Sequence, residues 1–553
     1  MNNLWSASGR GILLLALAGQ AGGESWGGSS DENEPLVVRV VHPDRQAAEF
    51  LRLFEGSRAA SPAAALASWK RATRNSDQLG KPLEAVIAMC NPDMVAEWKV
   101  LDGAELQLGF DPDDGSPHWF AIVPHDDGTV AAAITAARLT YPDDEPLREK
   151  GRETPVARLG RSGVPLAAQV GSRLILGSSR ADLLRGVHSI PSAFDPAYPI
   201  DSGLFFRLDA KRLTTPRSGS LGLRRTVEAL EGLNCRRVEG TLALADGRLT
   251  FDMATTLEAS QPPHPVETKP QPTVESAWLE HLPAVNVMAI VSMAVDPGPA
   301  FWDRAFSLAD RIERVDPARA GVALLRTRIN LLAVAAGIKP EADLWPHLRG
   351  VSACIWGDPR QPGQPIGAAL MLHLDEESNA ERLAREFVPR FGSLLPGRAT
   401  DKDAPPGRPV AGPPQGLGSR KPKRVGSILG RNLSVWRHDR DVMVAWGDEA
   451  LTAPLESKVP PATSIATVYN AWGRDVRVAP QRFGAFWPGR LFRPGTSSNP
   501  APATLRAFAD DPPVVWWGWN QSNRAHDRVR WPDLAGRVRR FLETIPLAPP
   551  QVP

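Results

Sequence analysis

Cysteine is scarce in this sequence. Its 553 residues include only Cys90, Cys235 and Cys354. They lie far apart and form no CxxC pair, which excludes a disulfide framework and a zinc–thiolate site. Cys90 and Cys354 sit in the apolar runs AVIAMC and VSACIWG. We therefore expect buried free thiols there.

An excess of one charge is also missing. The chain has 64 basic and 62 acidic residues, a net charge of +2. Domains that bind nucleic acid usually carry a basic excess, so we expect no nucleic-acid partner. The basic cluster RKPKR at 420–424 is the local exception. A solvated loop is the favoured interpretation, and contact with an anionic envelope lipid or polymer is the alternative.

Long apolar runs are absent beyond the N-terminus. The best is VNVMAIVSMAV at 285–295, which is too short to span a bilayer and predicts a buried strand. No transmembrane span is expected after the N-terminal segment. That segment has one basic residue, Arg10, then the apolar run Ile12–Ala18 and small residues. Residues 1–23 have the pattern of a secretory signal peptide, so we expect a periplasmic or extracellular protein. The alternative is an uncleaved anchor.

Recognisable catalytic motifs are missing as well. The sequence has no phosphate loop, no GxGxxG, no HExxH and no GxSxG. His125 and His373 are the one histidine pair at equivalent positions of an internal repeat, and we interpret both as strand-end residues. Aspartate-rich turns at 111–118 and 125–129 suggest calcium, but no complete binding loop is present. We expect no metal and no cofactor.

The order of patterns indicates a duplication. Segments that begin at Asn91 and Lys339 each give a short helix, a glycine, an apolar strand, Asp-Pro, a second strand and a histidine, at a nearly constant offset. We predict an α+β protein of two related modules, mostly antiparallel sheet packed with amphipathic helices. The modules are residues 34–258 and 277–546, joined by a Pro-rich linker at 259–276, and the second carries a disordered insert at 396–426.

Local signals place hairpins and helices within the modules. Hairpins are predicted around Gly171-Ser172, Asp439 and Asp246-Gly247. Amphipathic helices are predicted over 316–337 and 533–545, and the second of these is expected to end the second module.

Tryptophan is abundant, with 17 residues against three tyrosines. The stretch VVWWGWN at 514–520 reads as a strand, which we align with Leu204–Phe206 of the first half. The second half then lacks a final hairpin. A strand that is apolar on both faces is usually covered on both, which favours a core role. The alternative is a ligand-binding surface formed by Trp487, Trp516, Trp517 and Trp519.

The stretch GIKPEADLWPHLRGVSACIWGD, the paired strands and the strand–helix ending resemble a family of bacterial exported proteins known only as domain of unknown function 3352. The resemblance covers residues 34–258 and 277–546 and implies export and architecture but no reaction. We expect a non-catalytic binding or scaffold protein, with an envelope component or a polysaccharide as partner. The alternatives are a hydrolase with a site between the modules and a carbohydrate-binding protein that uses the tryptophans near 483–519.

Overall fold

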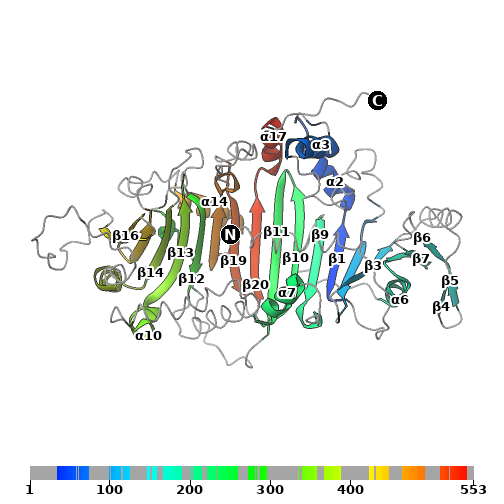
Figure 1. Ribbon diagram of the computed structural model, residues 1–553, viewed down its shortest axis with the longest axis horizontal. Coiled ribbons are helices and arrows are strands. Elements are labelled where there is room, and N and C mark those ends of the chain that lie inside the picture. Colours follow the sequence, from blue (N-terminus) through cyan, green and yellow to red (C-terminus); the bar gives the residue numbers. More distant parts are fainter. Residues whose placement is uncertain are drawn as a thin grey trace, which may run out of the picture. The chain divides into compact units, whose positions relative to one another are not determined.

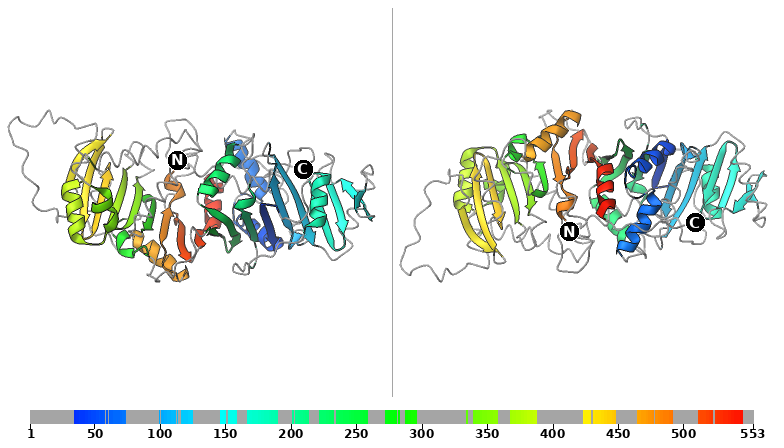
Figure 2. Two further views of the ribbon diagram at one scale, coloured as in Figure 1. Left: turned by 90° about the horizontal axis from the view of Figure 1, so that it is seen from below. Right: turned by 90° about the horizontal axis from the view of Figure 1, so that it is seen from above.

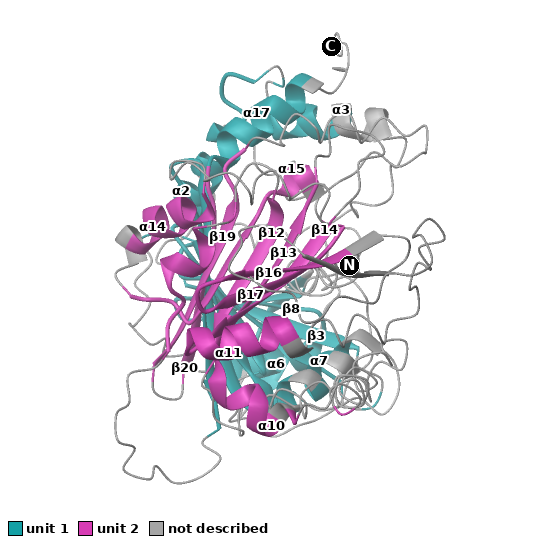
Figure 3. Ribbon diagram, turned by 90° about the vertical axis from the view of Figure 1, so that its left-hand side faces the viewer, with its two compact units in different colours: residues 1–258, 533–553 teal, residues 259–532 magenta. Residues whose placement is uncertain are grey.

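The computed structural model divides the chain into two compact units, residues 1–258 with 533–553 and residues 259–532 (Figure 3). It describes residues 34–57, 59, 61–73, 99, 101–111, 113, 116–124, 146–149, 152–158, 166–189, 201, 203–213, 221–232, 234–258, 272–280, 282, 287–295, 334, 339–357, 367–387, 423–428, 431–447, 464–476, 478–491, 511–521 and 524–544. The expected signal peptide, His125, Cys90, nearly all of the 316–337 helix and most of the linker and insert lie outside these residues.

Unit 1 is built on an antiparallel sheet. Its strands lie side by side in the order β11 (Arg248–Leu257), β10 (Cys235–Ala245), β9 (Gly203–Asp209), β1 (Leu36–Val41), β2 (Glu105–Phe110), β3 (Pro117–Pro124), β8 (Arg173–Gly177), β7 (Leu166–Val170) and β6 (Val156–Arg158). Strands β4 (Leu147–Glu149) and β5 (Arg152–Thr154) pair separately. The hairpin predicted around Gly171-Ser172 is confirmed as β7–β8.

The predicted hairpin at Asp246-Gly247 is also confirmed, as β10–β11. Both turn residues have positive φ, 50° and 68°, which is what a two-residue type I′ turn requires. Helices α2 (Pro43–Arg52), α3 (Pro62–Thr73) and α17 (Leu534–Thr544) gather near this turn, and α17 lies beside the two blue helices in the right-hand view of Figure 2. Helix η2 (Ala210–Arg212) and helix α7 (Leu221–Gly232) precede β10 at its other end (Figure 1).

Helix α17 packs within unit 1. The amide of Leu534 donates to the carbonyl oxygen of Gly247 at 2.7 Å. Leu542 is buried with Ala59 and Ala65, and Val538 packs against them. The helix was predicted correctly, but these contacts join it to unit 1 rather than to the second module.

Unit 2 is a second antiparallel sheet. Its strands follow the order β20 (Arg524–Trp531), β19 (Val514–Gln521), β18 (Arg482–Phe486), β12 (Val287–Ala294), β13 (Leu348–Trp356), β14 (Gly367–Leu374), β17 (Asp441–Trp446), β16 (Arg431–His438) and β15 (Lys423–Ile428). The buried strand predicted at 285–295 and the turn predicted near Asp439 are confirmed. Strand β15 begins inside the stretch expected to be a disordered insert.

The ending of unit 2 differs from expectation. Strands β19 and β20 form a hairpin, with Gln521 paired to Arg524, so the prediction that the second half lacks a final hairpin was wrong. Strand β19 therefore occupies the place in its sheet that β10 occupies in unit 1, and β18 occupies the place of β9. The alignment of Val514–Trp517 with Leu204–Phe206 was wrong. It failed because β20, RAHDRVRW, is too charged to read as an apolar strand.

The main core of unit 2 lies on one face of its sheet. Helices η3 (Ser276–Leu279) and α14 (Ile465–Val476) cover that face. A second cluster, around Leu348, Leu383 and Val442, packs at the β14–β17 side of the opposite face. The other helices of unit 2 are short: α10 (Pro340–Asp343), η5 (Trp345–His347), α11 (Glu377–Arg382), the π-helical turn η6 (Leu383–Phe387) and α15 (Pro488–Leu491).

Candidate functional site

Two of the four candidate ligand-binding tryptophans are buried. Trp517 is 3% exposed and packs against Phe483 and Tyr469, with ring centroids 6.0 and 5.0 Å away. Its indole N–H donates to the carbonyl oxygen of Val478 at 3.0 Å. Trp487 is also 3% exposed, and the guanidinium of Arg490 lies over its ring. Neither side chain offers a ring face to a ligand in this structure.

The other two tryptophans are partly exposed and lie on opposite faces of β19. Trp519 stacks on His526, with ring centroids 5.1 Å apart, beside the main core. Trp516 lies on the other face, where its indole N–H donates to the carboxylate of Asp527 at 2.9 Å. Its ring lies close to Gly484, so that a Cβ on Gly484 would come within 3.0 Å of the ring. Trp516 is therefore the one candidate that reaches the face of the sheet opposite the main core.

That face is apolar over the three central strands. Directly paired residues of an antiparallel sheet share a face. Pairing therefore places these side chains together: Ala289, Val291, Met293, Val351, Ala353, Ile355, Ala368, Leu370 and Leu372. Val291 and Leu370 are 43% and 44% exposed, and Ala353 between them is exposed. We call the line Trp516, Gly484, Val291, Ala353, Leu370 and Val444, whose members pair successively across the sheet, the apolar row.

A hydrogen-bonded Ser–His–Asp chain lies on the covered face of the same strands. The Ser352 hydroxyl is 2.8 Å from Nε2 of His373, and Nδ1 of His373 is 2.9 Å from a carboxylate oxygen of Asp441. The Ser292 hydroxyl adds a fourth member, 2.7 Å from that of Ser352. Both serines are fully buried and His373 is 1% exposed. His373 is thus a core residue held by two partners, whereas the sequence predicted only a strand-end histidine.

The strand register explains how these residues meet. His373 pairs directly with Asp441 of β17 on one side and with Gly350 of β13 on the other. Because Gly350 has no side chain, the Trp278 ring fits against it; a Cβ there would collide with that ring. The Trp278 ring stacks on His373 with a centroid distance of 4.3 Å and an angle of 7°. Ser352, two residues beyond Gly350, then lies diagonal to His373 and within reach of Nε2.

A polar recess adjoins this chain inside unit 2. It is lined by Glu275, Ala277, Trp278, Glu280, Arg349, Leu374, His438, Asp439, Arg440 and Asp441. Asp441 therefore joins the buried chain to the recess, while Trp278 lies against both. Deeper in the core, burial raises the pKa of the Cys354 thiol to about 12, so that thiol stays protonated and unreactive at neutral pH.

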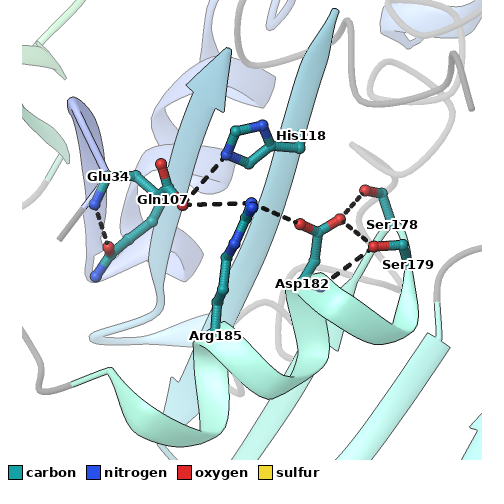
Figure 4. Close-up of polar contacts among 7 residues, drawn as sticks. All are labelled: Glu34, Gln107, His118, Ser178, Ser179, Asp182 and Arg185. Carbon is teal, nitrogen blue, oxygen red and sulfur yellow. Dashed lines mark hydrogen bonds and ion pairs between the residues drawn. The ribbon is translucent and has the colours of Figure 1, made fainter. Parts of the chain in front are cut away.

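Unit 1 has a charged network in a different arrangement (Figure 4). Arg185 of α6 (Arg180–His188) lies between two carboxylates, 3.6 Å from Glu34 and 3.3 Å from Asp182. Glu34 also pairs with Nε2 of His118 at 3.2 Å. Asp182 is 2% exposed and accepts from the hydroxyls of Ser178 and Ser179 at the start of the helix. The network fastens α6 and the segment before β1 to strand β3.

The same network continues into the sheet. Gln107 is fully buried; its amide nitrogen donates to Glu105 at 2.7 Å and to Ser189 at 3.0 Å. The second oxygen of Glu105 pairs with Arg39 at 2.9 Å. The carbonyl of the Gln107 side chain accepts from the amide of Glu34 at 3.1 Å. Each of these charges is matched by a neighbour, so the network acts as a structural anchor for α6 and β1.

The Ser–His–Asp chain escaped sequence reasoning because its members are far apart. Ser352 stands in the apolar run VSACIWG, 21 positions before His373, and Asp441 follows 68 positions later. The signal that could have found them is the register: paired strands at 348–356 and 367–374 would place Ser352 near His373. The apolar row was also missed, although the continuous apolar lettering of β12, β13 and β14 is typical of strands covered on both faces.

No group of three or more His, Cys, Asp or Glu side chains among the described residues could hold a metal ion. Nor does any helix in that part of the chain have the length and apolar character needed to cross a membrane. Comparison with models of protein families, with curated proteins and with solved structures finds no match for this chain.

Proposed function

We propose that this chain is an exported binding protein whose unit 2 sheet takes the apolar side of a partner's amphipathic helix. The observation that carries the proposal is the exposure of Val291, Ala353 and Leu370, directly paired on three central strands. The solvent face of an antiparallel sheet normally carries polar residues that alternate with core residues. Here burial alternates along most of each strand, but the paired outward-facing residues of the three strands are apolar as well.

The shape of the exposed face favours a helix as the occupant. Adjacent strands lie roughly 4.8 Å apart, so the step from Gly484 to Leu370 spans about 14 Å. That is close to the length of three helical turns, about 16 Å. The neighbouring row that contains Ile355 is also apolar, whereas Val351 and Leu372 in the row on the other side pack against the second cluster, around Leu348, Leu383 and Val442. A broad apolar sheet face is the surface on which helices pack in folded domains, and the opposite face of this sheet is covered in that way.

A synthetic amphipathic peptide of leucine and lysine tests the site directly. Binding of the labelled peptide is measured by fluorescence anisotropy for the wild type and for the double variant Val291→Asp, Leu370→Asp. Burial of an aliphatic side chain contributes about 1.5–3 kcal/mol, so the double variant should bind at least about tenfold more weakly. Val478→Asp with Leu257→Asp is the matched control, because these residues are 41% and 36% exposed elsewhere in the chain. Equal affinity of all three proteins would contradict the proposal.

A photo-crosslinking residue at position 370 identifies the natural occupant, with the same residue at position 257 as control. The proposal expects a crosslink to a second protein that is lost when Val291 is changed to Asp. A crosslink within the chain to residues 316–337, the helix predicted from sequence, would show that the protein covers its own sheet. That result would contradict the need for a partner.

We further propose that the two units are diverged copies of one module. Supporting this, β1 lies between β9 and β2 in unit 1, and β12 lies between β18 and β13 in unit 2. The remaining strands of the two sheets follow in the same relative order. Export is proposed from the signal-peptide pattern of residues 1–23, and the resemblance to domain of unknown function 3352 agrees with it.

A further inference from the structure

The hydrogen-bond chain in unit 2 has a definite direction. A carboxylate only accepts, so Asp441 accepts a hydrogen bond from the N–H at Nδ1 of His373. In the neutral ring Nε2 is then the acceptor, and the Ser352 hydroxyl donates to it. Ser292 in turn donates to Ser352. The order from donor to acceptor is therefore Ser292, Ser352, His373, Asp441.

This arrangement contains more polar groups than are needed to satisfy the hydrogen-bonding capacity of the buried serines and histidine. Two buried serines facing each other need no imidazole, and a buried histidine could be satisfied by one carboxylate and one backbone group. A hydroxyl that donates to an imidazole, which is itself oriented by a carboxylate, is the arrangement that activates serine as a nucleophile in unrelated folds. The distances of 2.8 and 2.9 Å fall within the range of such arrangements.

Trp278 covers the hydrogen-bonded Ser–His–Asp chain. Its ring covers one side of His373 and is 7% exposed, and the polar recess that includes Asp441 lies against it. The ring belongs to η3, a single turn whose backbone bond from Trp278 to Glu275 is 3.2 Å long. Displacement of one short turn would join the recess to His373 and Ser352.

We propose that Ser352 is a nucleophile, activated by His373 and Asp441, that a small ester reaches through the recess once Trp278 leaves its stacked position. The Ser352 oxygen bonds to the ester carbonyl carbon as its proton passes to Nε2 of His373. The alcohol departs with that proton and leaves an acyl-serine. Water then attacks the acyl carbon as His373 accepts a proton from it; the bond to the Ser352 oxygen breaks, the carboxylic acid departs, and His373 returns the proton to Ser352. This activity is independent of the helix-binding face.

A fluorophosphonate reagent is the probe, because it bonds through phosphorus to an activated serine and releases fluoride as the serine proton passes to the imidazole. Labelling is followed by intact mass, and the site is mapped to the peptide that contains residues 348–356. The wild type, Trp278→Ala and Trp278→Phe are compared, each checked by thermal melting. We expect one adduct, on Ser352, formed at least about tenfold faster in the Trp278 variants than in the wild type, in line with a buried nucleophile whose reaction is gated by opening.

Two matched variants separate activation from packing. Ser352→Ala and Ser292→Ala each remove one buried hydroxyl of the same pair, but only Ser352 contacts His373. Labelling should vanish in the first and persist in the second. Asp441→Asn keeps the side-chain shape and should slow labelling by roughly 10²–10⁴-fold, the range for loss of an oriented base. Absence of any adduct from the folded wild type and both Trp278 variants, or an adduct that survives Ser352→Ala, would overturn the proposal.

Discussion

Replacement of Trp517 by alanine tests whether the tryptophan-rich strand is core or ligand surface. In the structure this side chain is 3% exposed, packs against Phe483 and Tyr469, and donates its indole N–H to the carbonyl oxygen of Val478. Gly473 of α14 leaves room for the ring, since a Cβ there would lie 3.3 Å from it. Removal of the ring therefore leaves a void between β19 and α14.

The expected cost follows from the size of the lost side chain. Truncation of a buried tryptophan to alanine costs about 3–5 kcal/mol in transfer and cavity terms. For a unit of the size of residues 259–532, each kcal/mol lowers the melting temperature by roughly 2–4 °C. The variant should therefore melt about 6–20 °C below the wild type. Trp517→Phe keeps most of the ring contacts and loses one hydrogen bond, so it should cost nearer to 1 kcal/mol.

Differential scanning calorimetry of the three proteins measures these shifts, and retention on a polysaccharide column measures sugar binding. The core assignment requires a large loss for Trp517→Ala, a small one for Trp517→Phe and no dependence of retention on Trp517. If Trp517→Ala has the melting temperature of the wild type but is retained less on the polysaccharide column, the core assignment is wrong and the carbohydrate-binding interpretation is favoured.

Three further predictions use other parts of the chain. Burial alone would raise the pKa of Asp375, but hydrogen bonds from Asn379 and His347 and nearby positive charge hold that pKa below its ordinary value of 3.8. The wild type should therefore be more stable than Asp375→Asn above pH 3.8, and this difference should disappear as the pH falls below the lowered pKa of Asp375. An acid-unfolding titration of the two proteins measures it. Burial raises the pKa of Cys235 to about 11 and that of Cys354 to about 12, so iodoacetamide at pH 8 should modify both only after denaturation, as read by peptide mass. N-terminal sequencing of protein expressed in a bacterial host should find a start between residues 19 and 24, and an intact N-terminus would contradict export with cleavage.

Sequence reasoning succeeded where the determining chemistry is local. The Asp246-Gly247 turn predicts its hairpin because both residues tolerate positive φ. The turn at Asp439 is similar, with φ 49°. The β19–β20 hairpin was missed because its second strand, RAHDRVRW, is dominated by charged and polar residues, and Asp527 interrupts the apolar residues on its other face. The assignment of the last helix failed for another reason. The apolar stripe of α17 shows that the helix docks, but a stripe does not identify the surface that receives it.

Each sheet has a pair of polar residues on two neighbouring central strands, and comparison of the two pairs bears on the proposed duplication. In unit 1, Arg39 pairs in register with Glu105 and with Phe205; in unit 2, Ser292 pairs in register with Ser352 and with Phe483. The two pairs occupy corresponding positions in the strand order of their sheets, but unit 1 has an ion pair there and unit 2 has two hydroxyl groups.

The difference follows from access to water. The Arg39 side chain is 27% exposed, so it keeps part of its hydration while it satisfies a buried carboxylate. Ser292 and Ser352 are fully enclosed, where an ion pair would lose more solvation than it regains. Neutral hydroxyls avoid that cost, and one of them, Ser352, lies 2.8 Å from Nε2 of His373, so the imidazole is also satisfied without an ion pair at this centre.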